Sequence, residues 1–159
     1  MSYEFYVTIE GKQQRKFQGE AKGQGLDEKI VGIAFSYDVK SPRDAASGMA
    51  MGKRQHGPVI ITKEWGAASP QIFQALVENE VLRTVLVEFV RTNEEGAEEI
   101  YQTIKLSNAF VTEIRQYSSV SDKGIGKDLE DISFTFSRIE MSNLPGKTTA
   151  DDDWMAARS

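Results

Sequence analysis

Side chains that could carry out chemistry are few in this sequence. The 159 residues include one histidine, His56, and no cysteine. A histidine that acts as a general base needs a nucleophile and an orienting acid beside it, and the sequence does not show either near His56, which is followed by Gly57 and Pro58. We therefore predict a structural role for His56. The missing cysteines exclude disulfides, thiolate nucleophiles and cysteine-based zinc sites.

Two glycine-containing segments match phosphate-binding loops only in part. Residues 124–127 read Gly-Ile-Gly-Lys, but the complete P-loop pattern requires glycine and Ser/Thr where Ser121 and Asp128 stand. Residues 23–25 read Gly-Gln-Gly, and the third glycine of the dinucleotide fingerprint is replaced by Glu28. We predict ordinary turns at both places.

Two acidic runs are candidates for acid–base chemistry or for binding of a hard metal ion. They are Glu98 with Glu99, and Asp151 to Asp153. We interpret the first as a solvated hairpin edge and the second as a solvated tail. The sequence therefore predicts no catalytic residue, no metal site and no cofactor, and the chain is not expected to be an enzyme.

The overall charge limits the classes of partner that the chain can bind. The chain carries 24 acidic and 19 basic residues, a formal net charge of −5, which disfavours a protein that must neutralise many phosphates of a nucleic acid. No run approaches the length of about 18 apolar residues that a membrane-spanning helix needs, and the first residues lack the pattern of a signal peptide. We expect a protein made in the cytoplasm, without membrane insertion.

A two-residue alternation of apolar and polar side chains, which is typical of strands with one buried face, recurs along the chain. It covers residues 5–9, 30–40, 84–89, 100–106, 109–117 with a kink at Ser107-Asn108, and 132–137, and a short β-branched run covers 59–62. One helix is predicted from Ser69-Pro70, where serine can cap and proline can start a helix, to about Asn79. Its apolar stripe is formed by Ile72, Phe73, Leu76 and Val77. The fold class expected is mainly β: a small antiparallel β-barrel of two packed sheets with one α-helix.

Residues 41–58 have no hydrophobic period and are longer than most irregular loops, which indicates a functional or disordered segment. Met49 and Met51 lie in it, and they contact either another chain or their own domain.

Small polar residues form rows on the predicted strands. Ser36 with Asp38, and Ser133, Thr135 and Ser137, stand where exposed sheets usually carry Lys or Glu. Such a face is either an ordinary solvent face or a smooth wall that lines something. Beyond Met141, breakers and charge indicate a loose tail.

Several blocks resemble the Hcp family, which builds the inner tube of the bacterial type VI secretion system. The most specific block is residues 52–65, which contains an Arg-x-His-x-Pro stretch and continues into the Ser-Pro helix at 68–76. Residues 5–11, 106–111 and 133–140 are similar as well. The resemblance covers about residues 3–141.

The resemblance implies a tail-tube-like domain over residues 1–141, with a short flexible tail over 142–159. Six copies would close into a ring, and rings would stack into a tube inside a contractile sheath on a baseplate. The tube, tipped by the VgrG spike, would carry small effector proteins and leave the cell without a signal peptide.

The resemblance also implies roles for the unexplained residues. Lumen or cargo contacts are expected at Ser36, Asp38, Ser133 and Thr135. Subunit or ring contacts are expected at Met49, Met51 and Arg54. The alternatives are a tail tube protein of another, phage-type contractile particle, and a monomeric ligand-binding β-barrel.

Overall fold

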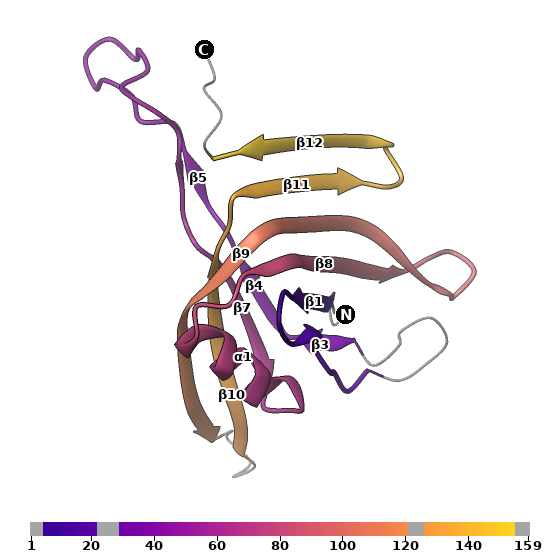
Figure 1. The fold of residues 1–159 in the computed structure, drawn as a ribbon. Helices are drawn as coiled ribbons and strands as arrows, with labels where there is room; N and C mark the ends of the chain where they lie inside the picture. Colours follow the sequence, from indigo (N-terminus) through magenta and orange to yellow (C-terminus); the bar gives the residue numbers. More distant parts are fainter. Residues whose placement is uncertain (1–4, 22–28, 121–125, 155–159) are drawn as a thin grey trace.

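The structure is a computed structural model and describes residues 5–21, 29–120 and 126–154 (Figure 1). One helix, α1 (Ala68–Val77), accompanies the strands in this part of the chain. The strands are β1 (Phe5–Gly11), β2 (Arg15–Lys16), β3 (Ile30–Gly32), β4 (Ala34–Ser36), β5 (Val39–Lys40), β6 (Gln55–His56), β7 (Val59–Glu64), β8 (Leu82–Thr92), β9 (Glu98–Val120), β10 (Gly126–Thr135), β11 (Arg138–Asn143) and β12 (Thr148–Asp153). The prediction of a mainly β, antiparallel fold with one helix is confirmed.

Two sheets share the long strand β9. Its first half pairs with β8 on one side and β11 on the other, and its second half pairs with β10. The first sheet continues from β8 to β1 and from β11 to β12, and the second continues from β10 to β7 and β4. The predicted kink is present, because Asn108 has a φ of 48°. Figure 1 shows β9 curving from one sheet into the other.

The hydrogen-bonded path does not close into the expected barrel. β3 pairs with β1 and β4 pairs with β7, and only Ile33 separates the two strands in sequence. The Ile33 N–H donates to the Thr62 carbonyl at 2.8 Å. Within the described residues no ladder joins β1 to β7. The strand predicted over residues 30–40 is thus divided into β3, β4 and β5. Because β3 pairs with β1 and β4 pairs with β7, the short segment around Ile33 links two parts of an open sheet that no ladder closes.

The core lies between the two sheets and under the helix. Alternate residues of the strands point into it, and the fully buried ones include Val7, Ile9, Ile61, Val87, Leu106, Ile132 and Phe134. Burial of this apolar area is the main favourable contribution to folding. The period-two pattern of the sequence predicted these inward positions because it follows the pleat.

The helix differs in detail from its prediction. It begins at Ala68, and Ala67 occupies the N-cap position without a side-chain hydrogen bond. The hydroxyl of Ser69 instead accepts the Gly66 N–H at 2.9 Å. Ile72 is buried, but Phe73 is 57% exposed, so the buried face is narrower than the predicted stripe.

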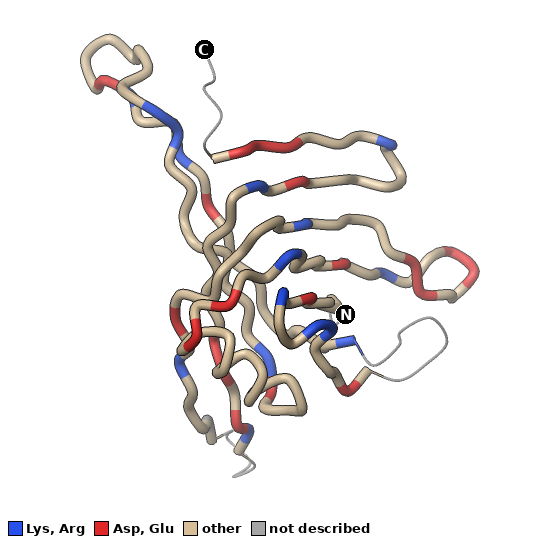
Figure 2. The backbone as a smooth tube through the Cα atoms, viewed as in Figure 1, with Lys and Arg blue, Asp and Glu red and all other residues tan. Residues whose placement is uncertain are grey.

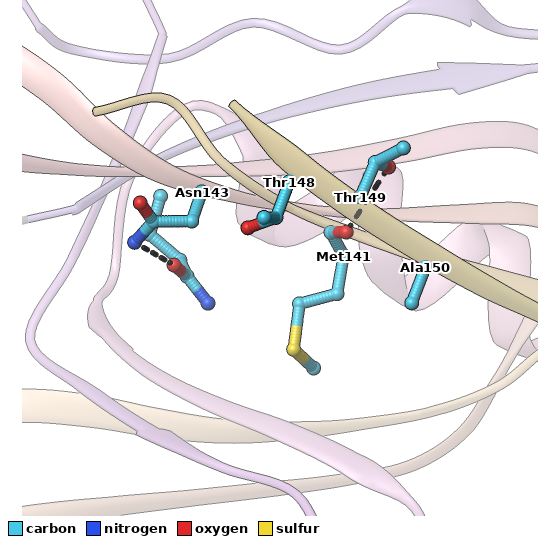
Figure 3. A pocket seen from close by; sticks show the side chains of 6 residues that line it. Met141, Asn143, Thr148, Thr149 and Ala150 are labelled. Atoms are coloured by element: carbon cyan, nitrogen blue, oxygen red, sulfur yellow. Dashed lines mark hydrogen bonds between the residues drawn. The ribbon is translucent and has the colours of Figure 1, made fainter. Parts of the chain in front are cut away.

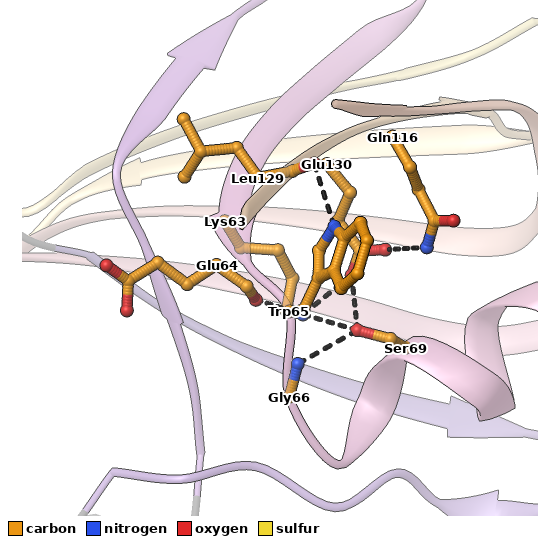
Figure 4. Close-up of polar contacts among 8 residues, drawn as sticks. All are labelled: Lys63, Glu64, Trp65, Gly66, Ser69, Gln116, Leu129 and Glu130. Carbon is orange, nitrogen blue, oxygen red and sulfur yellow. Dashed lines mark hydrogen bonds and ion pairs between the residues drawn. The ribbon is translucent and has the colours of Figure 1, made fainter. Parts of the chain in front are cut away.

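A fully buried ion pair fixes the helix to the second sheet (Figure 4). Lys63 Nζ on β7 lies 2.7 Å from Glu130 Oε2 on β10, and both side chains are almost completely inaccessible. The Ser69 hydroxyl donates to the same oxygen at 2.7 Å, and Gln116 of β9 donates to the other at 3.0 Å. Burial raises the pKa of Glu130, but the hydrogen bonds from Lys63, Gln116 and Ser69 outweigh it and lower that pKa.

The C-terminal segment is ordered where a loose tail was expected. β12 pairs with β11 over the full length of both strands, from Arg138 opposite Asp153 to Asn143 opposite Thr148. The breakers at 144–147 form the turn of this hairpin, in which the Lys147 N–H donates to the Leu144 carbonyl at 3.2 Å. The prediction of a flexible tail is therefore wrong for residues 142–153, while 155–159 lie outside the described residues.

Replacement of Lys63 tests the buried pair. Lys63→Met leaves the Glu130 charge buried without its cation, and we expect the free energy of unfolding to fall by about 3–5 kcal/mol. Urea unfolding at neutral pH measures this loss. The matched control is Lys127→Met, which breaks the exposed Lys127–Glu64 pair and should cost about 1 kcal/mol or less. The double variant Lys63→Met with Glu130→Leu should recover most of the loss.

The pH dependence gives a second test of this pair. Because folding lowers the pKa of Glu130, its contribution is present above the unfolded pKa and is lost as the pH falls through the folded pKa. The stability difference between the wild type and Lys63→Met should therefore narrow in acid. A difference that stays constant from neutral to acidic pH would contradict this assignment.

Candidate functional site

The most prominent feature outside the two sheets is a projecting hairpin, residues 39–56, which we call the arm (Figure 1). β5 and β6 pair at its base, and Arg43 bridges Ala50 further out. At the tip, the Gly48 N–H donates to the Asp44 carbonyl at 2.8 Å, and Gly48 has a φ of +73° that favours glycine. The segment predicted as functional or disordered is thus an ordered hairpin.

Met49 and Met51 are exposed on the arm, at 68% and 57%. Neither folds back onto its own domain, which was one of the two alternatives from the sequence. Adaptable apolar side chains on a projecting hairpin are typical of a surface that contacts another chain.

The base of the arm is held by a polar cluster around His56, whose side chain is only 3% exposed. Its Nδ1 lies 2.8 Å from Tyr37 Oη, and its Nε2 lies 2.8 Å from Asp152 Oδ2. Arg54 donates through Nε to the same Asp152 oxygen and through Nη2 to the Asp153 carbonyl at 2.7 Å. A neutral ring with its proton on Nε2 satisfies both neighbours of His56. The histidine therefore links the arm to the C-terminal hairpin. The hydroxyl beside it, that of Tyr37, has a raised pKa and is not activated as a nucleophile.

The Asp152 carboxylate stays charged over the ordinary pH range. The hydrogen bond from Arg54 is the main cause that lowers the pKa of Asp152 to about 2, and His56 contributes in the same direction against the effect of burial. Burial, followed by the nearby Asp152 and Asp38 charges, raises the pKa of Tyr37. Figure 2 shows the acidic run on β12 and the basic residues along the arm.

Aromatic rings close the cluster on one side. Trp154 stacks on Phe136 with ring centroids 5.5 Å apart, and it meets the His56 ring edge-on at the same distance. Sequence reasoning missed Tyr37 and Trp154 as members of a site. It noted the acidic run that contains Asp152 but interpreted it as a solvated tail, whereas Asp152 binds Arg54 and His56. No pattern signalled Trp154, because it follows a segment without apolar alternation.

Outward side chains of β4, β7 and β10 form a second surface, which we call the polar face. Its members are Ser36, Ile60, Thr62, Asp131, Ser133 and Thr135. Ser36 and Ser133 both lie opposite Ile60 in the ladders, so they share one row across three strands. Thr62 donates to the Asp131 carboxylate at 2.7 Å. Three of the four residues expected at the lumen thus lie on one face.

Asp38, the fourth residue expected at the lumen, lies at the foot of the arm. Its carbonyl accepts the Gly57 N–H at 2.8 Å, and a Cβ atom at Gly57 would collide with its carboxylate. Of the expected contact residues, Met49 and Met51 lie far out on the arm, whereas Arg54 is engaged within its own chain.

The C-terminal hairpin carries two hollows. One, of about 270 Å³, is lined by Gln102, Met141, Asn143, Thr148, Thr149 and Ala150 (Figure 3). The other, of about 260 Å³, lies between the hairpin and the foot of the arm, and is lined by Tyr37, Val39, His56, Ile139, Met141, Ala150, Asp151 and Asp152. Met141 and Ala150 are common to both. The first hollow has no titratable side chain in its lining that could activate the hydroxyls of Thr148 and Thr149, so it can accept a side chain but offers no activated nucleophile.

Other chemistry has little support. Lys63 Nζ donates to Ser69 Oγ at 3.3 Å, and the Ser69 hydroxyl donates to Glu130, so the lysine does not act as a base for the serine. No three His, Asp or Glu residues among those described could hold a metal ion.

α1, the one helix of the described chain, is too short and polar to cross a membrane. The glycine segment at 23–25, and Gly124 and Ile125 of the other, lie outside the described residues.

Comparison with known proteins identifies the family. The sequence model described as "Type VI secretion system effector, Hcp" matches residues 6–142. The "Major exported protein" of Pseudomonas aeruginosa is 34% identical over 139 residues, which are 86% of this chain and 81% of that protein.

Solved structures agree with this result. A structure described as "Crystal structure of Hcp protein" has a TM-score of 0.87 and 26% identity, and the match covers 95% of this chain and 99% of the other. "Secreted protein Hcp3 from Pseudomonas aeruginosa" has a TM-score of 0.79 and 27% identity, with 97% and 99% covered.

These matches confirm the resemblance noted in the sequence. They also confirm that the protein is not an enzyme, since the family consists of structural, secreted proteins. The chain therefore belongs to the Hcp family of the type VI secretion system.

Proposed function

We propose that this chain is the structural subunit of the inner tube of a type VI secretion system. Six copies close into a ring, rings stack into a tube, and contraction of the surrounding sheath expels it. Family membership supports this function. The observation that carries it is the arm, an ordered hairpin that holds Met49 and Met51 exposed and away from their own domain.

The arm suits a contact between successive rings. Contact of the arm with a different surface of another copy is heterologous, and such contacts build open linear assemblies unless the geometry closes. Met49 and Met51 supply the apolar contact, and burial of each contributes about 1.5–3 kcal/mol. Arg54 serves the same contact from within its own chain, because its bonds to Asp152 and Asp153 hold the base of the arm.

Side-by-side copies would cover the sheet edges. β12 is an edge of the first sheet and β4 an edge of the second. Unpaired edges invite pairing with other chains, and charged residues such as Asp151–Asp153 on β12 oppose indiscriminate pairing. Neighbours within a ring can occupy these edges in a defined register.

The polar face suits the wall of the lumen. Ser36, Ser133 and Thr135 are short and uncharged, and the Asp131 carboxylate is occupied by Thr62 and Tyr117. Such a wall leaves space for small effector proteins and binds them through many weak contacts. Asp38, which is exposed at the foot of the arm, adds a negative charge beside this wall.

The remaining partners follow from the assembly. The tube carries a VgrG spike at its tip and lies within a sheath that rises from a baseplate. The chain leaves the cell through this apparatus, in line with the name of its relative, "Major exported protein". Neither nucleic acid nor membrane insertion has a part in this function.

The mass of the purified protein tests the ring directly. Light scattering should give about six times the 17.8 kDa of one chain, and negative-stain images of the same peak should show rings. A stable 17.8 kDa monomer at high concentration would contradict the ring and revive the ligand-binding barrel.

Charges on the arm should disrupt stacking. In the double variant Met49→Asp with Met51→Asp, two carboxylates replace the apolar contact, and we expect the association constant between rings to fall by more than about tenfold, about 1.4 kcal/mol. Tube length in electron micrographs and sedimentation velocity measure this change. Met49→Leu with Met51→Leu is the matched control, and it should stack like the wild type. Normal tubes from the Asp variant would remove the arm from the stacking contact.

A bulky charge on the polar face should reduce binding of cargo. Ser36→Arg should leave rings intact and lower the yield of co-purified effector, because the guanidinium narrows and charges the wall. Thr92→Arg, which adds the same side chain at an exposed position on the other sheet, is the control. Equal yields from both variants would place the cargo contact elsewhere.

A further inference from the structure

The arm is connected to the body by two short linkers outside the main sheets. β5 and β6 form a sheet of their own, separate from the ten strands of the two main sheets. Tyr37 and Asp38 separate β4 from β5, and Gly57 and Pro58 separate β6 from β7. Backbone pairing of the main sheets therefore ends before the arm begins, and other contacts must set the direction in which the arm points.

The C-terminal hairpin supplies those contacts. Asp152 on β12 binds Arg54 and His56 through the same carboxylate oxygen, Oδ2. Trp154, directly after β12, packs edge-on against His56 and stacks on Phe136. Charged hydrogen bonds of this kind are stronger than neutral ones and constrain orientation as well as distance.

Packing beside this cluster is incomplete. The 260 Å³ hollow separates Val39 of the arm from Ile139 and Met141 of the hairpin. Val39 is half exposed as a result. Because the apolar surfaces do not close around the junction, the connection depends on polar and ring contacts. From the hairpin these are the contacts of Asp152, the Asp153 carbonyl and Trp154. Phe136 adds an edge-on contact with the His56 ring.

We propose that Asp152 and Trp154 are positioning residues, and that the C-terminal hairpin is a brace that sets the angle of the arm and so the place where Met49 and Met51 meet the next ring. β12 and Trp154 lie beyond residue 142, where the match to the family model ends. The matches to solved Hcp structures cover 95% and 97% of the chain and so extend into this segment. The link to ring stacking rests on the proposed function, whereas the link to the arm does not.

Distance measurements within one chain test the brace without assembly. The chain has no cysteine, so Ser47→Cys at the tip of the arm and Thr92→Cys at the end of β8 provide two unique sites for spin labels. Double electron–electron resonance, with labelled chains diluted in unlabelled protein, should give one narrow distance peak when the labelled chain keeps Asp152. Asp152→Ala should lose this single peak and give a broad distribution.

The matched control is Asp151→Ala, which removes the neighbouring carboxylate that pairs with Arg138 and should keep the narrow peak. Arg54→Ala, from the arm side, should broaden the distribution like Asp152→Ala, and the two together should add little, as coupled partners do. Circular dichroism melting confirms that the variants are folded. If Asp152→Ala does not fold, Trp154→Ala and Arg54→Ala carry the test.

Tube formation by the same variants tests the link to stacking. We expect Asp152→Ala to form rings but shorter tubes, and Asp151→Ala to form tubes of normal length. A narrow peak in Asp152→Ala and Arg54→Ala would overturn the brace. A broad peak together with normal tubes would overturn its role in stacking. If the unsubstituted chain forms no tubes, the proposed function fails, while the distance measurement still decides on the brace.

Discussion

One bent strand determines how the rest of this protein is arranged. β9 is 23 residues long and pairs with β8, β11 and β10 in turn. Its change of direction is taken up at Asn108, a residue type that tolerates a positive φ better than most. Without this bend the inner faces of the two sheets could not face each other, and residues such as Leu106 and Val111 would not reach the same core.

Burial between the two sheets explains which strands could be predicted from the sequence. Strands around Val7, Val87 and Ile132 bury one face completely, so their alternation predicted both the strand and its inward side chains. β12 could not be predicted this way, because Thr-Thr-Ala-Asp-Asp-Asp has no buried face and is ordered by backbone pairing with β11. Pairing partners are a property of the whole chain, which a local pattern does not contain.

Of the two candidate surfaces, the polar face could be predicted from the sequence and the cluster at the base of the arm could not. Ser36, Ser133 and Thr135 were found because a strand's outward positions follow from its inward ones. The cluster at the base of the arm was not found, since Asp152 is 96 residues from His56 in sequence. Helix α1 was predicted from Ser69-Pro70, yet the main partner of Ser69 is Glu130 of another strand, 61 residues away. Polar contacts over such separations depend on a topology that has to be known first.

The arm acts mechanically as a lever. Its tip at residues 44–48 is hydrogen-bonded within itself, and backbone pairing continues through Arg43 and Ala50 to the base, so bonds hold the hairpin together along its length. Six to seven residues of extended chain give a length of roughly 20 Å from base to tip. On that length, a rotation of about 10° at the base displaces the tip by about 3–4 Å, roughly one residue step along a strand. In an assembly that uses such arms, the precision of the contact at the tip is therefore set at the base of the arm. There, a displacement of a fraction of an ångström becomes a shift of about one residue at the tip.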